Sequence, residues 1–404
     1  MEQNFTELRL KTHKVFLPGT PISDYHLFAG RQSQMTSVIN GVHQPGRHVI
    51  LYGERGVGKT SLSKTLVDIL RNDNYRTLET STINCDETDD FSVLWQKVFR
   101  VMPYGKDEQS GRAVYLDSFL PKTGVVPDDI QYCLSRFQEP SIIVLDEVDQ
   151  LVDEETKNLL AATLKNSSDH SANTTIILVG VADTVDELIR QHRSIERSLV
   201  QVRMPRMSRK EISDIIELGL EKLGMTIESK GKNVIVDLSQ NLPFYAHCFG
   251  LYSALRAIDD KRLEITFEDV ASSTIEVIRN SHNVTSAYHQ AIYSPQKTNN
   301  YDKALLACAL TPRDELGFFS ATDVGKAMSI LMGKKYEVPG YIHYLNEFCG
   351  NKRAKVLEKV GEKRRIRYRF VDPLMQPFVV INAFVKNELP LDAFTHNENK
   401  ETIH

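Results

Sequence analysis

The amino-acid sequence predicts an α/β protein in which a parallel sheet forms the first domain, a helical domain follows, and a winged helix ends the chain. Three observations support this prediction. Short apolar runs alternate with helix-like runs in the first half. Strand patterns become rare from about Ser208. Helical runs and then two β-rich runs occupy the last part of the chain, as in a winged helix.

The elements of the first domain follow from this alternation. Five runs rich in apolar and β-branched residues are the expected strands: 48–52, 76–84, 141–146, 174–180 and 199–204. Helical periodicity occupies the intervals at 32–42, 59–71, 90–101, 128–138, 154–166 and 184–191. The run "IIVL" is apolar throughout, which is typical of a strand buried on both faces. The segment 103–127 has Pro and Gly and little periodicity, so we interpret it as a loop or insertion.

A helical domain begins at the capping box "SRKE", in which Ser208 and Glu211 satisfy each other's backbone groups. Its expected helices are 208–223, 231–241, 244–258, 267–280 and 284–293. Pro295 and the polar "QKTNN" indicate a linker. Three further helical runs then precede "AKVLEKVG" and "RRIRYRFV", which we expect to pair as a hairpin around Gly361.

The predicted domain boundaries follow from these elements. They are an N-terminal segment over 1–24, a sheet core over 25–206, a helical lid over 207–295, a winged helix over 299–386 and a disordered polar tail over 387–404.

Composition excludes several classes of protein. The net charge is −4, so the chain is not a polycation that coats nucleic acid. The five cysteines form no C-x-x-C pair, which argues against a disulfide framework and a zinc site. The longest apolar runs are shorter than the ~20 residues of a membrane helix. We therefore expect a cytoplasmic protein with no membrane partner.

The stretch "GERGVGKTSL" matches G-x-x-x-x-G-K-[ST], the P-loop or Walker A pattern, and lies between a strand and a helix. Its glycines allow successive N–H groups to point at phosphate oxygens, and the helix that follows presents its positive end. Lys59 adds a charge near the β- and γ-phosphates, and Thr60 offers a hydroxyl to Mg²⁺. The residues expected to bind ATP are Gly53, Glu54, Arg55, Gly56, Val57, Gly58, Lys59, Thr60 and Ser61.

A second motif, "SIIVLDEVDQL", has the apolar-then-acidic pattern of a Walker B strand. Asp146 ends the strand, where its carboxylate is expected to hold Mg²⁺ together with Thr60. Glu147 follows at the position of a base that orients or deprotonates the attacking water. By itself, "DEVDQ" also fits a solvated acidic turn; the two motifs together predict an ATP hydrolase.

These motifs resemble those of the AAA+ class of P-loop ATPases, in particular the origin-recognition or initiator-type clade and the STAND-like bacterial ATPases. The resemblance spans about 25–385. "FAGR" (28–31) is similar to the family segment that contacts adenine, and an ordinary helix-start turn is the alternative. The resemblance implies that "HRSIERSLVQVRMP" supplies an arginine finger to a neighbouring subunit, with Arg197 as the first candidate and Arg193 as the second. It therefore implies a homo-oligomer on ATP binding; a solvated basic helix end is the alternative.

The sequence departs from the family pattern at two sensor positions. After the strand 174–180 the family usually has Asn, Thr or Ser, whereas this chain offers Asp183 and Thr184; we interpret Asp183 as the cap of the next helix. At the lid helix many relatives have an Arg where this chain has Phe244 and Tyr245. Tyr245 or His247 is therefore a candidate nucleotide contact, and a core role is the simpler interpretation.

The stretch 351–370 has nine basic and two acidic residues, a net charge of 9 − 2 = +7. Strand alternation places Ile366, Tyr368 and Phe370 on one face and arginines on the other. The candidate nucleic-acid contacts are Lys363, Arg364, Arg365, Arg367 and Arg369. A solvated face that prevents edge pairing and an acidic protein partner are the alternatives.

Together these features predict a nucleotide-dependent switch of the initiator, loader or transposition-regulator type that engages DNA through a basic winged helix. The alternative is a STAND-like signalling or defence ATPase that binds a protein partner. Absence of a basic recognition helix favours the alternative, and the basic hairpin favours DNA.

Overall fold

The computed structural model describes residues 2–21, 28–72, 79–106, 112–136, 140–170, 173–189, 195, 197–296, 299–314, 316–361 and 366–389. The chain divides into two compact units. Pro21–Pro205 form one, which we call the sheet unit. Met1–Thr20 and Arg206–His404 form the other, which we call the helical unit.

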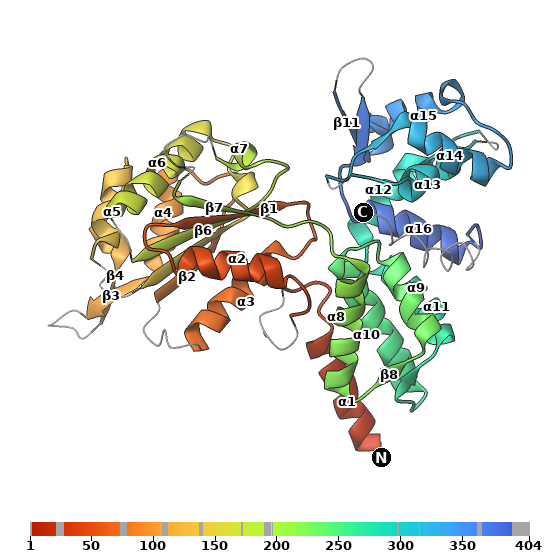
Figure 1. Ribbon diagram of the computed structural model, residues 1–404, viewed down its shortest axis with the longest axis horizontal. Coiled ribbons are helices and arrows are strands. Elements are labelled where there is room, and N and C mark those ends of the chain that lie inside the picture. The colour runs from red at the N-terminus through yellow and green to blue at the C-terminus, as the bar shows by residue number, and fades with distance from the viewer. Residues whose placement is uncertain are drawn as a thin grey trace. The chain divides into compact units, whose positions relative to one another are not determined.

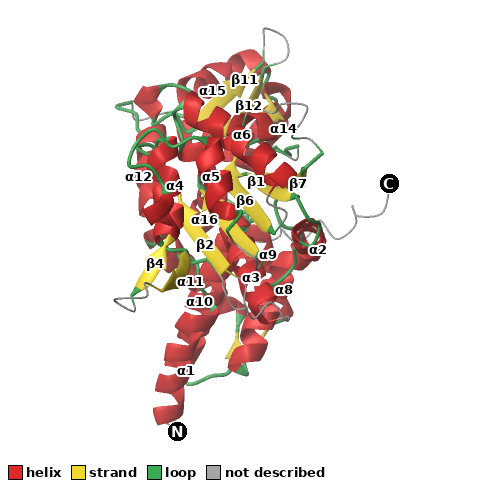
Figure 2. Ribbon diagram, turned by 90° about the vertical axis from the view of Figure 1, so that its left-hand side faces the viewer, coloured by secondary structure: helices red, strands yellow, loops and turns green. Residues whose placement is uncertain are grey.

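The sheet unit contains the predicted parallel sheet. Its strands are β1 (His48–Gly53), β2 (Glu79–Asn84), β5 (Ser141–Asp146), β6 (Thr174–Val181) and β7 (Leu199–Arg203). They lie in the order β2-β5-β6-β1-β7, and each neighbouring pair is parallel. The prediction of an α/β fold with a parallel sheet is confirmed. Figure 2 shows several of these strands side by side.

Helices lie on both faces of this sheet, as parallel strands require. They are α2 (Gln32–Val42), α3 (Lys59–Asn72), α4 (Phe91–Arg100), α5 (Pro127–Leu134), α6 (Glu154–His170) and α7 (Val185–Leu188), with 3₁₀ turns η2 (Leu116–Phe119) and η3 (Val148–Gln150). Figure 1 shows α2 and α3 on one face and α4, α5 and α6 on the other. The sheet is therefore the middle of three layers.

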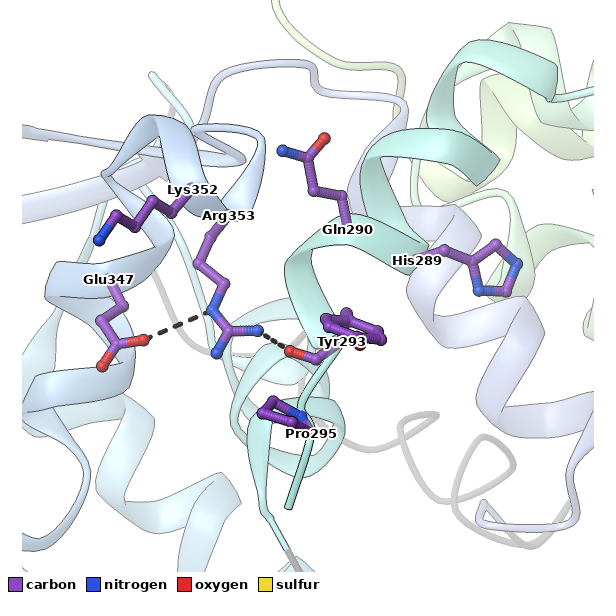
Figure 3. A pocket seen from close by; sticks show the side chains of 7 residues that line it. All are labelled: His289, Gln290, Tyr293, Pro295, Glu347, Lys352 and Arg353. Atoms are coloured by element: carbon purple, nitrogen blue, oxygen red, sulfur yellow. Dashed lines mark hydrogen bonds and ion pairs between the residues drawn. The ribbon is translucent and has the colours of Figure 1, made fainter. Parts of the chain in front are cut away.

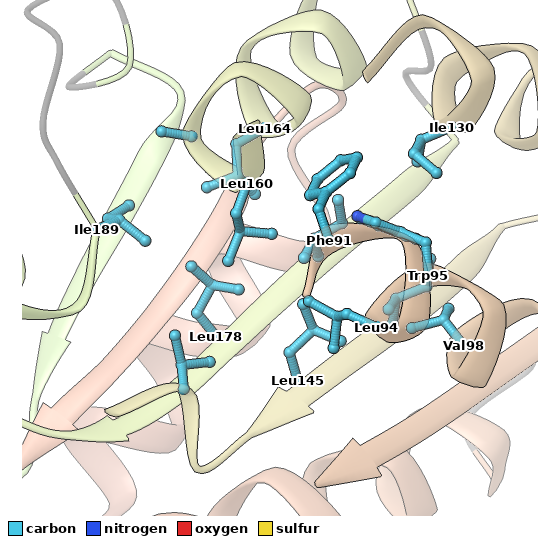
Figure 4. Packing of buried hydrophobic residues seen from close by; sticks show 14 of the residues in the cluster. Phe91, Leu94, Trp95, Val98, Ile130, Leu145, Leu160, Leu164, Leu178 and Ile189 are labelled. Atoms are coloured by element: carbon cyan, nitrogen blue, oxygen red, sulfur yellow. The ribbon is translucent and has the colours of Figure 1, made fainter. Parts of the chain in front are cut away.

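The core of the sheet unit lies between the sheet and α4, α5 and α6. Trp95, the one tryptophan of the chain, is fully buried there beside Phe91 and Phe99. Figure 4 shows the side chains of α4 pointing toward Leu145 of β5 and Leu178 of β6. Helix α4 is strongly amphipathic, and Asp90 caps it by accepting a hydrogen bond from the Val93 amide.

The segment 103–127, which we interpreted as a loop or insertion, contains regular structure. A short antiparallel hairpin is formed by β3 (Pro103–Lys106) and β4 (Ala113–Tyr115), and η2 follows it. Strands of four and three residues are too short to produce a readable period of two.

The helical unit begins, in chain order, with an N-terminal helix and continues after the sheet unit. Its first elements are α1 (Glu2–Val15), α8 (Arg209–Leu223), β8 (Thr226–Ile227), α9 (Ser229–Leu238), α10 (Pro243–Asp259), β9 (Glu264–Ile265), α11 (Phe267–Arg279) and α12 (His282–Ile292). The Ser208–Glu211 capping box at α8 is present as predicted. Helices α8 to α12 match the five helices expected for the lid.

Helix α1 packs against α8 and α10 (Figure 2). Phe16, the residue after α1, is 1% exposed, and its ring fills a slot between two glycines. A Cβ on Gly219 or on Gly250 would lie 2.5 or 2.4 Å from that ring. The backbone amide of Leu17 donates to Nδ1 of His247 at 3.4 Å. The N-terminal segment is therefore an ordered part of the helical unit.

The C-terminal region combines helices with a three-stranded antiparallel sheet of order β10-β12-β11. Its elements are α13 (Tyr301–Leu310), β10 (Phe319–Ser320), α14 (Ala321–Met332), η4 (Val338–Gly340), α15 (Ile342–Phe348), η5 (Asn351–Arg353), β11 (Leu357–Val360), β12 (Arg367–Phe370) and α16 (Met375–Val385). Helix α16 returns to pack on α11, α12 and α13. The predicted tail lies almost wholly outside the described residues, which end at Leu389.

Neither a membrane span nor a disulfide appears in the part of the chain that the structure describes. No helix there has the length and apolar character needed to cross a bilayer. All five cysteines are free thiols.

Candidate nucleotide-binding site

All five parallel strands of the sheet unit end at one edge, and the last residues of three of them define the candidate site. β1 ends at Gly53, β5 at Asp146 and β2 at Asn84. The register pairs Asn84 with Asp146 across neighbouring strands. Carboxyl ends of parallel strands at a shared edge are the usual position for ligands in open α/β sheets. The predicted P-loop and the predicted Walker B acids therefore belong to the same edge.

The P-loop backbone needs glycine at three positions. Gly53, Gly56 and Gly58 have φ values of 147°, 81° and 96°, a region that L-residues rarely adopt. A Cβ on Gly53 would lie 2.4 Å from the carbonyl oxygen of Met204. A Cβ on Gly58 would meet nothing within 4 Å, so this side of the loop is open. Helix α3 then begins at Lys59.

The side chain of Lys59 is held over the loop. Its Nζ donates to the carbonyl oxygens of Gly53 at 3.0 Å and Glu54 at 2.7 Å. Burial lowers the pKa of Lys59 to about 8, and the carboxylates of Asp149, Asp146 and Glu54 act in the opposite direction. An ammonium group has three protons, and two are used here. A phosphate oxygen is a suitable acceptor for the third.

Asp146 and Glu147 differ in burial and in backbone conformation. Asp146 is 3% exposed, and its Oδ1 accepts from the Glu147 amide at 2.9 Å. Glu147 is exposed and has φ 58°, ψ 37°, in the left-handed region. A non-glycine residue there costs about 1–2 kcal/mol. The turn therefore fixes a buried acid at the strand end and presents a solvent-exposed one beside it.

Sequence reasoning did not single out two polar residues at this edge. Asn84 is exposed at the end of β2. Asp149 lies in η3, and its Oδ1 accepts from the Val181 amide at the end of β6 at 2.7 Å. Both residues could have been identified from the sequence, because each is a polar residue at or just after a predicted strand end.

Arg31, the last residue of "FAGR", was also missed as a contact of the loop. It is 2% exposed and has φ 60°. Its guanidinium donates to the carbonyl oxygens of Val57 at 3.0 Å and of Pro205. A buried arginine that binds backbone carbonyls leaves no pattern in the sequence, so only the structure could identify it.

The loop conformation, the lysine that contacts its carbonyl oxygens and the acid at the end of β5, which β6 separates from β1, define a P-loop nucleotide-binding site. The nucleotide fits the open loop and the remaining proton of Lys59, and Mg²⁺ fits the hydroxyl and carboxylate oxygens that Thr60 and Asp146 provide. Residues 27–178 match the family described as the AAA ATPase domain. The fold and the match identify this part of the chain as an AAA+ P-loop ATPase domain.

Comparison with solved structures supports the same fold over most of the chain. The Aeropyrum pernix ORC1 protein, solved in complex with DNA, is 15% identical with a TM-score of 0.50, covering 93% of this chain and 97% of that one. The Aeropyrum pernix ORC2 protein, in ADPNP-ADP complexes, is 13% identical with a TM-score of 0.53, covering 93% and 98%. A Walker-type ATPase of Pyrococcus abyssi is 16% identical with a TM-score of 0.50, covering 90% and 99%. No curated protein matches this chain. Most of the chain therefore shares the fold of these proteins.

The candidate arginine finger lies at the amino ends of the strands, whereas the P-loop lies at their carboxyl ends. Arg197 is exposed and precedes β7, whose first residue Leu199 pairs with His48 at the start of β1. The P-loop begins at the other end of β1, about 17 Å away at ~3.3 Å per residue. A hollow beside Arg197 is lined by Pro45, Gly46, Arg47, Lys165, Ser168, Asp169, Arg197 and Ser198. Arg193 lies outside the described residues.

The interpretation of Asp183 as a helix cap is wrong. Thr184 is the N-cap residue of α7, and its hydroxyl donates to Glu187 at 3.2 Å. The amide of Asp183 donates to the same carboxylate at 3.0 Å. Asp183 precedes the cap by one residue, because α7 begins at Val185 rather than at the predicted 184.

The aromatic residues of α10 lie in the core of the helical unit. Tyr245 is fully buried, and its hydroxyl donates to the Leu374 carbonyl at 2.7 Å. His247 is 6% exposed and edge-on to Phe16. Burial lowers the pKa of His247 to about 4. The core role, the simpler of the two interpretations, agrees with these contacts.

The described part of the basic hairpin is paired within the chain. Tyr368 and Phe370 are buried on one face of β12, as alternation predicts. On the other face, Arg367 forms an ion pair with Asp314 and Arg369 with Glu358. Both guanidinium groups also lie over the ring of Phe318, at 4.7 and 4.6 Å. Lys363, Arg364 and Arg365 lie outside the described residues.

A hollow near α12 and η5 is the other cavity of note, and Figure 3 shows its lining. The guanidinium of Arg353 bridges its two sides. It donates to the Ala291 carbonyl at 3.1 Å and pairs with Glu347 at 3.4 Å. It also lies 3.6 Å from the ring centre of Tyr301. These contacts join the end of α12 to the C-terminal region.

Proposed function

We propose that this protein is an ATP-hydrolysing switch of the AAA+ class. The observation that carries the proposal is the shared edge at which the P-loop, Lys59 and Asp146 meet. The amides of Gly53–Thr60 and the start of α3 bind the phosphates. Thr60 and Asp146 hold Mg²⁺, which when bound neutralises charge on the β- and γ-phosphate oxygens.

Glu147 is the proposed base for the attacking water. Its side chain is exposed, so the carboxylate can contact a water molecule, and its backbone amide donates a hydrogen bond to Asp146. Water attacks the γ-phosphorus, and the bond between this phosphorus and the oxygen that bridges the β- and γ-phosphates breaks, so that ADP leaves. The proton of the water passes to Glu147.

Arg197 is proposed to complete the site of a neighbouring copy. A guanidinium stabilises the charge that develops on the transferred phosphoryl group. Arg197 and the P-loop of the same chain lie at opposite ends of the strands of one sheet, and this separation supports the proposal that the arginine acts in trans. ATP binding is therefore proposed to accompany assembly of a homo-oligomer in the cytoplasm.

We further propose that the switch engages DNA through the C-terminal region. The three-stranded sheet β10-β12-β11, in which the hairpin strands β11 and β12 follow α13, α14 and α15, supports the winged-helix proposal. The ORC1 protein of similar fold was solved in complex with DNA. The basic residues at 363–365 and Lys359, Lys355 and Lys352 carry the positive charge that DNA requires.

A protein partner in place of DNA is the second candidate function, as in STAND-like ATPases. The pairing of Arg367 with Asp314 and of Arg369 with Glu358 favours it, because these two cations are already neutralised. Fewer free cations mean fewer phosphate contacts and a weaker salt dependence.

The ATPase rate with and without duplex DNA, at low and moderate salt, tests the two candidates. DNA binding predicts a rate stimulated by duplex at low salt, with the stimulation falling steeply as salt rises. The variant carrying Lys363, Arg364 and Arg365 all changed to Ala should lose the stimulation and keep the basal rate. A rate indifferent to DNA under both conditions contradicts the DNA role and leaves the ATPase proposal intact.

A further inference from the structure

Gln376 is a buried amide at which three other segments of the helical unit meet. It lies in the first turn of α16 and is 0% exposed. Its Oε1 accepts from Nη1 of Arg206 at 2.6 Å. Its Nε2 donates to Oε1 of Gln240 at 2.6 Å and to the Ala309 carbonyl at 3.0 Å. These partners belong to the segment before α8, to the turn between α9 and α10, and to α13.

The chemistry of the partners allows one orientation of this amide. A guanidinium only donates and a backbone carbonyl only accepts, so the oxygen of Gln376 faces Arg206 and the nitrogen faces Ala309. Both protons of the nitrogen are used. A buried polar network that is satisfied in this way favours a single arrangement, because each broken bond leaves a desolvated group without a partner.

The turn that receives Gln376 is itself fixed to the start of the helical unit. Gln240 and Asn241 have φ values of 47° and 68°, a region that non-glycine residues rarely adopt. The Gln240 carbonyl accepts from Arg206 at 3.4 Å, and the Asn241 carbonyl accepts from the Met207 amide at 3.0 Å. The turn, the segment before α8 and the start of α16 are therefore held together.

A second set of contacts joins the C-terminal region to α12. The ring of Tyr288 is edge-on to Phe378, with 5.4 Å between ring centres, and its hydroxyl accepts from Nδ2 of Asn382 at 2.7 Å. Arg353 of η5 donates to the Ala291 carbonyl near the end of the same helix at 3.1 Å. These contacts are separate from the buried amide network, so the two regions meet at more than one place.

We propose that α8 to α12, the helices expected for the lid, and the C-terminal region respond to ATP as one rigid body, and that Gln376 locks them together. The polar link between α12 and α13 is then not a hinge, because α16 and η5 bridge it. This inference rests on the proposed ATP-dependent switch. A displacement that ATP imposes on the lid is carried unchanged to the C-terminal region.

Distances between paired spin labels test this proposal. One pair is Ile275→Cys in α11 of the lid and Ile330→Cys in α14 of the C-terminal region, at positions that are 44% and 81% exposed. The second pair is Ile275→Cys and Val101→Cys, the latter in the sheet unit and 50% exposed. Cys349→Ser is added to both, since the other four native cysteines are buried. Double electron–electron resonance gives each distance distribution with and without ATP and Mg²⁺.

We expect the pair that joins the lid to the C-terminal region to give one narrow distribution that ATP leaves unchanged, while the pair that joins the two units shifts. Gln376→Ala should broaden the first distribution, because Arg206, Gln240 and Ala309 lose their shared partner. Gln296→Ala is the matched control, the same change at an exposed glutamine of the link, and should keep the distribution narrow. Circular dichroism checks that each variant is folded. Gln240→Ala, which removes one bond of the network, takes the place of Gln376→Ala if that variant does not fold.

Two results would overturn the inference alone. One is a lid-to-C-terminal distribution that is broad in the wild type or changes when ATP binds. The other is a folded Gln376→Ala or Gln240→Ala variant with a distribution as narrow as that of the wild type. If ATP does not bind, or binds and shifts neither pair, the proposed switch is wrong and the inference fails with it.

Discussion

Glu147 can be tested at the scale of a single residue, because its carboxylate is exposed and makes no contribution to the core. Glu147→Gln should bind ATP like the wild type and hydrolyse it about 10²–10⁴ times more slowly, which is the usual contribution of a general base. The measurement is ATP turnover by phosphate release, with the Kd for ATP as the control. Turnover at the wild-type rate removes Glu147 from the base role.

His48 gives a prediction about pH and stability. Its Nδ1 accepts from the Ile176 amide at 3.0 Å, and its Nε2 donates to the Leu164 carbonyl at 3.0 Å, so the ring is neutral. Burial lowers the pKa of His48 to about 4 from 6.5. In the unfolded chain His48 is protonated below about pH 6.5, whereas in the folded chain it stays neutral down to about pH 4. The free energy of unfolding therefore falls as the pH drops from about 6.5 to about 4. The loss is about 3 kcal/mol.

Trp95 reports this loss, since the single tryptophan lies in the core of the same unit. Urea unfolding followed by Trp95 fluorescence should show a lower free energy of unfolding at pH 5 than at pH 7.5. His48→Gln should be less stable at pH 7.5 and should show a smaller drop between the two pH values. An equal drop in both proteins contradicts the assignment to His48.

At the scale of elements, Phe16 is the anchor of α1. Phe16→Ala should destabilise the helical unit by about 3–5 kcal/mol, the usual cost of a buried Phe→Ala change. Leu10→Ala, at a position of α1 that is 63% exposed, is the matched control and should have little effect. The measurement is urea unfolding by far-UV circular dichroism, with Trp95 fluorescence as a separate signal from the sheet unit. A Phe16→Ala transition that coincides with the Leu10→Ala transition contradicts the anchoring role.

Elements with a strong period were predictable, and contacts between distant segments were not. The alternation of strands and helices predicted the parallel sheet, because buried strands are apolar throughout and helices repeat every three or four residues. The acids at the end of β5 were predictable from the same pattern. The Phe16 slot was not, because it depends on two glycines more than 200 residues away, and Arg31 was not, because its partners are backbone carbonyls.

For the molecule as a whole, a finger that acts in trans requires more than one copy of the chain. Arg197→Ala should bind ATP normally and hydrolyse it poorly, by a factor of about 10³ or more. Mixing it with Lys59→Ala subunits should restore part of the activity, because the second variant supplies an intact arginine to the intact P-loop of the first. The measurement is turnover across a series of mixing ratios. Mixed oligomers that form and stay inactive contradict a finger acting in trans.

Binding of ATP at the shared edge of the sheet is the claim on which every other proposal depends. Isothermal titration of ATP with Mg²⁺ into the wild type and into Lys59→Ala tests it most directly, with circular dichroism to confirm that both are folded. We expect one site per chain in the wild type and no measurable binding in the variant. Tight binding by a folded Lys59→Ala variant, or no binding by the wild type, would contradict it.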